Sequence, residues 1–124
     1  MDYWFVAAGV VSGLIAAIHL VPGGRTVARP LLNAQDIAPV AKYVNYYCWH
    51  NVSFVLILMA GLFVAAGYGY FATAFGLVGI LLAAFLCIWG LALPVLKRQR
   101  FTDMPQGWLF APVLVLGLVG IAVS

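Results

Sequence analysis

Long runs of apolar residues alternate with short polar segments along this chain. The apolar runs cover residues 3–21, 52–66, 71–96 and 105–123. A helix needs about 20 such residues to cross the hydrocarbon core of a bilayer. The second run is shorter, but helical periodicity without Gly or Pro extends it back to about Val40. The pattern therefore predicts membrane-spanning helices at residues 3–21, 40–67, 71–96 and 105–123.

Turn-forming residues separate the predicted helices. Pro22-Gly23-Gly24 follows the first apolar run and predicts its end, and Gly67-Tyr68-Gly69-Tyr70 predicts a tight turn after the second. Asp103 is expected to cap the last helix, with Pro105 in its first turn. The remaining connections are expected to be loops at residues 22–39 and 97–104. The residues before the first run are Met1-Asp2, acidic rather than basic, so this run is interpreted as a retained helix and not a secretory signal.

The composition points to a membrane protein. Of the 124 residues, 66% are hydrophobic and only 7% are charged, whereas about a quarter of the residues in a soluble domain are charged. We therefore expect an all-α integral membrane four-helix bundle, formed by residues 1–124 as a single transmembrane domain.

Basic residues predict the orientation of this bundle. All six lie in or beside the two predicted loops: Arg25, Arg29, Lys42, Lys97, Arg98 and Arg100. The positive-inside rule makes that face cytoplasmic and places both termini on the non-cytoplasmic side of a bacterial inner membrane. The net charge of +3 then favours attraction to anionic lipid headgroups. No soluble basic domain is present, so nucleic acid is not an expected partner.

Polar and aromatic side chains gather near the predicted cytoplasmic end of the first two helices. The only histidines, His19 and His50, are expected at similar depths there, and ionisable residues at membrane depth usually face a protein interior. At about 100 degrees per residue, six side chains of the second helix share an arc of roughly 140 degrees. These six are Lys42, Asn45, Tyr46, Trp49, His50 and Ser53. Ser12 shares a face with His19 on the first helix. The sequence thus predicts a pocket formed by Ser12, His19, Tyr46, Trp49, His50 and Ser53 under the loop of residues 25–36.

Two arginines extend this pocket hypothesis to an anion. Arg25 and Arg29 are four residues apart beside Gly23 and Gly24, and would share a face if this segment were helical. Guanidinium groups at a membrane surface suit a phosphate or carboxylate headgroup. The alternative is that the two arginines serve only to orient the chain.

Several functions remain open for the predicted pocket. The first is binding of a small amphiphile or lipid headgroup, or service as an accessory subunit, in a homo-oligomer or a larger membrane complex. The second is a redox protein in which His19 and His50 ligate b-type haem, or hold a quinone with a tyrosine. A small transporter or channel is the third, although few polar residues are available to line a path. A structural role of the two histidines in joining the helices is the fourth.

Catalytic and metal chemistry have little support in the sequence. No glutamate occurs, and Asp2, Asp36 and Asp103 all lie outside the apolar runs. Two histidines with one loosely placed aspartate fall short of the three or four ligands of a typical zinc site. Cys48 lies on the opposite side of its helix from His50, which disfavours a Cys–His pair. We therefore expect neither catalytic residues nor a metal site, and binding rather than enzymatic activity.

Three segments resemble a family of small four-helix bacterial inner-membrane proteins of uncharacterised function. They are "HLVPGGRTVARPLL" at residues 19–32, "CWHNVS" at residues 48–53 and "MPQGWLFAPVLVLGLVG" at residues 104–120. The resemblance covers nearly the whole chain, including the Trp-His pair at the start of the second helix. It implies a four-helix fold and a shared role for His19, Trp49 and His50, and it implies no particular reaction.

Overall fold

The computed structural model describes all 124 residues, and every regular element in it is helical. The elements are α1 (Tyr3–Leu20), the π-helical turn η1 (Gly24–Ala28), α2 (Arg29–Asn33), α3 (Pro39–Gly67), α4 (Ala72–Leu96) and α5 (Gln106–Val123). Four helical stretches are long and apolar enough to span a membrane, which confirms the all-α class and the number of candidate spans.

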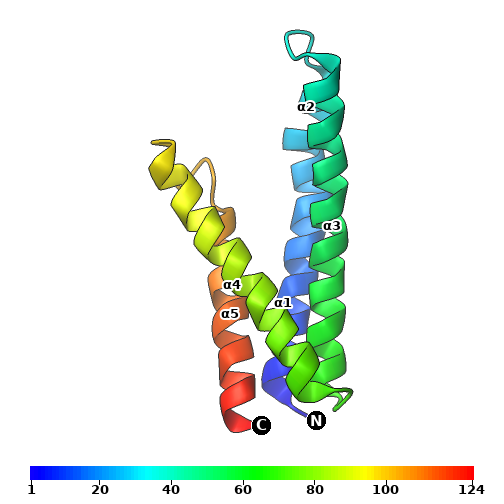
Figure 1. Ribbon diagram of the computed structural model, residues 1–124, viewed down its shortest axis with the longest axis vertical. Helices are drawn as coiled ribbons and strands as arrows, with labels where there is room; N and C mark the ends of the chain where they lie inside the picture. Colours follow the sequence, from blue (N-terminus) through cyan, green and yellow to red (C-terminus); the bar gives the residue numbers. More distant parts are fainter.

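The helices form two antiparallel pairs (Figure 1). α1 packs along α3, and α4 packs along α5. The pairs adjoin at the end that holds both chain termini and the turn between α3 and α4, which we call the terminal end. They separate toward the opposite end, which holds α2 and the α4–α5 connection (Figure 1). All six Lys and Arg residues lie toward that second end, which we call the basic end.

Two phenylalanine rings join the helix pairs. Phe5 of α1 and Phe63 of α3 are fully buried, with their ring centroids 6.2 Å apart. Glycines of α4 and α5 surround these rings: Gly76, Gly79, Gly117 and Gly120. A Cβ on Gly76 would lie 2.6 Å from the Phe5 ring, so the glycines leave the space that the rings fill. This contact anchors α4 and α5 against α1 and α3 near the terminal end.

The segment expected to be a loop at residues 22–39 is largely helical. α1 ends at Leu20, but helical turns resume almost at once and continue through η1 and α2 to Asn33, so one apolar helical stretch covers Tyr3–Asn33. Pro22 has no N–H to donate to the preceding turn, while its carbonyl accepts from the Thr26 hydroxyl at 3.0 Å. The i to i+5 bonding of a π-helix accommodates such an interruption without ending the helix. The helix is therefore interrupted at Val21 but does not stop at Pro22-Gly23-Gly24.

The last helix begins differently from the expectation. Pro105 occupies the capping position, no side chain caps the helix, and the first helical residue is Gln106. Asp103 instead lies in a turn, where its backbone N–H donates to the Arg100 carbonyl at 3.1 Å. The predicted Asp103 cap is wrong, because the turn of residues 100–104 places Asp103 too far before the helix.

Candidate functional site

His19 contacts α3 through a compact cluster with Trp49 and Ser53. Its Nε2 lies 3.0 Å from the Ser53 hydroxyl oxygen and 3.3 Å from the Trp49 carbonyl oxygen. The Ser53 hydroxyl donates to the same carbonyl at 3.1 Å. The imidazole and indole rings are stacked, with centroids 3.9 Å apart and an interplanar angle of 20°. We call this group the His19 cluster.

Hydrogen-bond chemistry assigns the proton in the His19 cluster. The Trp49 carbonyl can only accept, so its contact with Nε2 is favourable when Nε2 carries the hydrogen. Nε2–H is then shared between the Trp49 carbonyl and the Ser53 oxygen, and the Ser53 hydroxyl donates a hydrogen bond to the same carbonyl. In this arrangement the Nε2–H of His19, the Ser53 hydroxyl and the Trp49 carbonyl all have hydrogen-bond partners.

Beside the His19 cluster, the extended first helix and α3 border a cleft of about 290 Å³. From the first helix it is lined by Leu20, Gly24, Ala28, Arg29, Leu32 and Asn33, and from α3 by Tyr46, Trp49 and His50. Leu20, Gly24, Ala28 and Leu32 follow one another at four-residue spacing. An α-helix has 3.6 residues per turn, so such a series drifts around it. The π-helical turn between them, with more residues per turn, reduces that drift and keeps the series on the cleft.

The polar groups of the cleft are a guanidinium, an imidazole, an amide and a phenol. Arg29, Asn33 and His50 are exposed, and Tyr46 is partly buried with its ring edge-on to that of His50 at a centroid distance of 4.6 Å. No aspartate or glutamate lines the cleft. A guanidinium can hold a phosphate or carboxylate through two parallel hydrogen bonds. Leucine and tryptophan side chains beside these groups give the cleft an apolar surface as well.

The structure divides the residues predicted for the pocket. Tyr46, Trp49 and His50 line the cleft together with Arg29. His19 and Ser53 lie beside it in the His19 cluster, and Arg25 is exposed outside its lining. Ser12 is fully buried, and its hydroxyl donates to the Ala8 carbonyl of its own helix at 2.7 Å. Seven residues of helix separate Ser12 from His19, or about 10 Å, so Ser12 does not belong to the cleft.

Five cleft residues were missing from the sequence prediction. They are Leu20, Gly24, Ala28, Leu32 and Asn33. Each lies in or beside the segment expected to be a loop, where a shared helical face was expected only for Arg25 and Arg29. The sequence does contain a pattern that indicates these residues. Leu20, Gly24, Ala28 and Leu32 follow one another at four-residue spacing, and Arg29 and Asn33 have the same spacing.

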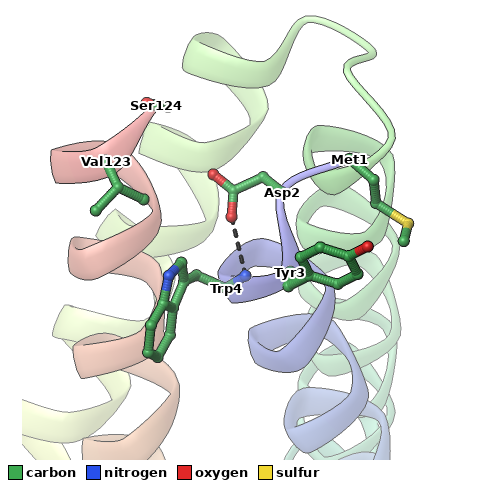
Figure 2. A pocket seen from close by; sticks show the side chains of 6 residues that line it. All are labelled: Met1, Asp2, Tyr3, Trp4, Val123 and Ser124. Atoms are coloured by element: carbon green, nitrogen blue, oxygen red, sulfur yellow. Dashed lines mark hydrogen bonds between the residues drawn. The ribbon is translucent and has the colours of Figure 1, made fainter.

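A larger cavity of about 430 Å³ lies at the terminal end (Figure 2). Met1, Asp2, Tyr3, Trp4, Val123 and Ser124 line it. Asp2 is its one charged side chain, and the carboxylate oxygen Oδ1 accepts from the backbone N–H of Trp4 at 2.9 Å and of Phe5 at 3.3 Å. This carboxylate caps α1. The cleft between the first helix and α3 is smaller but is the better candidate site, because the Arg29 guanidinium and the His50 imidazole line it from two different helical segments.

No three residues among His, Cys, Asp and Glu lie close enough together to hold a metal ion. Cys48 is exposed and Cys87 is buried in α4, and both are free thiols. Comparisons of this chain with models of known protein families, with curated proteins and with solved structures found no match. The residues of the cleft are therefore the basis for a functional interpretation.

Proposed function

We propose that this protein is a multi-pass protein of the bacterial inner membrane that binds an anionic amphiphile in the cleft between its first helix and α3. The amphiphile carries a phosphate or carboxylate headgroup, which Arg29 and His50 bind, and its apolar part lies against Leu20, Leu32 and Trp49. The basic end faces the cytoplasm and both termini face the opposite side. The gathering of all six Lys and Arg residues at one end of the molecule supports this orientation.

The length of α3 supports a cleft at the headgroup level. Gly67 ends α3 at the terminal end, and Trp49 lies 18 residues earlier, or about 27 Å along the helix. The hydrocarbon core of a bilayer is about 30 Å thick. If Gly67 lies at one boundary of the core, Trp49 and His50 lie close to the other. Tryptophan and tyrosine favour that boundary, since their rings are both apolar and polar.

The observation that carries the proposal is that hydrogen-bond donors and apolar side chains line the same cleft. Arg29, Asn33 and His50 offer hydrogen-bond donors without a neighbouring carboxylate to compete for them, and apolar side chains adjoin them. Axial ligation of haem by both histidines is less well supported. Nε2 of His19 is engaged with Ser53 and Trp49, and the indole covers one face of the imidazole. Only Nδ1 of His19 remains for a metal.

The proposal predicts that Arg29 dominates binding of anionic amphiphiles. Dioctanoyl phosphatidylglycerol is titrated into the purified protein, and bound lipid is counted by native mass spectrometry. A charge-assisted hydrogen bond contributes about 1.5 to 3 kcal/mol, so Arg29→Gln should weaken binding by about tenfold or more. Arg25→Gln is the matched control, because it removes the same charge one turn away without altering the cleft lining, and it should change binding by less than about threefold.

Further titrations identify the ligand chemistry. Dodecanoate offers a carboxylate, inorganic phosphate offers the anion without an apolar part, and dioctanoyl phosphatidylcholine offers a headgroup without net charge. Binding of phosphatidylglycerol or dodecanoate in preference to the other two supports an anionic amphiphile, and the tighter of the pair identifies the headgroup. Equal losses in the Arg25 and Arg29 variants, or phosphatidylcholine binding as tightly as phosphatidylglycerol, would refute the proposal.

A further inference from the structure

We propose that His19 is a positioning residue that fixes the Trp49 indole as a wall of the cleft, together with Ser53 and Gly23. His19 does not line the cleft, whereas Trp49 does. The inference rests on the proposed function only where it links the position of Trp49 to ligand affinity. The positioning of Trp49 itself is independent of any ligand.

Contacts with α1 and its continuation hold Trp49 in place. The imidazole of His19 stacks on the indole at a centroid distance of 3.9 Å. Gly23 lies against the far edge of the same indole, where a Cβ would be 2.9 Å from Cη2 of Trp49. The missing side chain at Gly23 therefore makes room for the ring. The indole is thus confined by an imidazole and by backbone one turn further along the same helical stretch.

Hydrogen bonds hold the imidazole in its stacking position. Nε2 of His19 contacts both the Ser53 hydroxyl and the Trp49 carbonyl, and Ser53 is buried. A stacked ring without such bonds could slide or rotate, whereas two acceptors on α3 fix the plane of the imidazole relative to that helix. Ser53 lies one helical turn from Trp49, so the group that orients the imidazole and the ring that stacks on it belong to one segment of α3.

The two histidines therefore have different roles. His50 is exposed and lines the cleft, with the Tyr46 ring nearly perpendicular to its own, and is available to a ligand. His19 acts through Trp49. A tryptophan at a membrane boundary otherwise has freedom about two side-chain torsions. Removing that freedom before the ligand arrives lowers the entropic cost of binding.

Substitutions at His19 and Ser53 test this role, with Trp49 as the reporter. The other three tryptophans are replaced in a Trp4→Phe, Trp89→Phe, Trp108→Phe background, and acrylamide quenching and near-ultraviolet circular dichroism then report on Trp49. His19→Ala removes both the stacking and the hydrogen bonds, His19→Phe restores an aromatic ring, and Ser53→Ala removes one acceptor. Ser12→Ala is the matched control, because it deletes a buried hydroxyl that bonds only to its own helix.

Acrylamide should quench Trp49 most strongly in His19→Ala and less strongly in Ser53→Ala and His19→Phe. Quenching in Ser12→Ala should equal that of the single-tryptophan parent protein. Dioctanoyl phosphatidylglycerol binding should weaken by about fivefold in His19→Ala, because Trp49 must then be ordered when the ligand binds, and should recover in part in His19→Phe. If His19→Ala fails to fold, Ser53→Ala and His19→Phe give the same comparison.

Unchanged quenching and dichroism of Trp49 in the His19 and Ser53 variants would refute the positioning role. A looser Trp49 with unchanged lipid binding would refute the link to affinity while leaving the proposed function intact. Failure of the proposed function would give a different result, because Arg29→Gln and Arg25→Gln would then bind phosphatidylglycerol with the same affinity. The Trp49 measurements would still decide the role of His19.

Discussion

The glycines of this chain differ in what surrounds them, and their neighbours decide which of them are structurally required. Gly107 of α5 meets Gly90 of α4 so closely that a Cβ on Gly107 would lie 2.5 Å from the Gly90 carbonyl carbon. Gly61 of α3 has no atom within 4 Å of the equivalent position. Close approach of backbones lets transmembrane helices gain van der Waals contact where lipid offers no hydrophobic driving force.

At the residue scale we predict opposite results for two glycine-to-alanine substitutions. Gly107→Ala should lower the free energy of unfolding by about 1 to 3 kcal/mol, because backbone atoms cannot move aside for the new methyl group. Gly61→Ala should leave stability unchanged or raise it slightly, because alanine favours the helix. Thermal unfolding of the purified variants in detergent measures both. Equal melting temperatures would show that α4 and α5 are not in backbone contact at this point.

The residues of the candidate site show what helical phase predicts and what it leaves out. Phase placed Tyr46, Trp49, His50 and Ser53 on one arc of α3, and in the structure all four lie at the cleft or in the adjoining His19 cluster. Phase could not show that Ser53 bonds to His19 while His50 remains exposed, because that depends on the rotation of α1 relative to α3. Ser12 shares a helix face with His19, but it is fully buried about 10 Å further along the helix and does not reach the cleft.

At the element scale, the first helix carries the main difference between expectation and structure. The length of the apolar runs was enough to predict four candidate spans, because that length is set by the bilayer. Local signals in Pro22-Gly23-Gly24 predicted a stop, yet the helical stretch continues to Asn33. The continued stretch contacts α3, where Gly23 lies against the Trp49 ring, and its helical bonding passes through the π-helical turn η1. Four of the five missed cleft residues lie in this stretch and follow from this error, whereas Leu20 belongs to the predicted helix of residues 3–21.

α3 is longer than the hydrocarbon core that it crosses in the proposed topology, and this predicts uneven exchange of its amides. Its 29 residues extend about 43 Å, against about 30 Å for the hydrocarbon core. Backbone amides of residues 41–46 should therefore exchange with solvent at least about tenfold faster than those of residues 56–63, because local opening is easier where water reaches the helix. Hydrogen exchange followed by mass spectrometry in lipid nanodiscs measures the difference. Equal protection would indicate that a second copy or another subunit covers the start of α3.

At the scale of the whole molecule, the separation of charge between the two ends predicts one orientation in the membrane. In a Cys48→Ser, Cys87→Ala background, single cysteines are introduced by Gln35→Cys at the basic end or Tyr68→Cys at the terminal end. Both replaced residues are exposed. A membrane-impermeant maleimide should label the first variant in inverted vesicles and the second in right-side-out vesicles. The reverse pattern would contradict the proposed topology and move the cleft to the other leaflet.

The phenylalanine contact between the helix pairs also has a mechanical consequence. Phe5 and Phe63 fit among four glycines near the terminal end, while α4 leans away from α3 toward the basic end (Figure 1). From Gly79, which packs on the Phe63 ring, α4 runs 17 residues to Leu96, a lever arm of about 26 Å. A rigid rotation of about 10 degrees at the rings would carry Leu96 through about 4 to 5 Å. The two aromatic rings would thus act as the fulcrum, and the distance between the helix pairs at the basic end would be set from the terminal end.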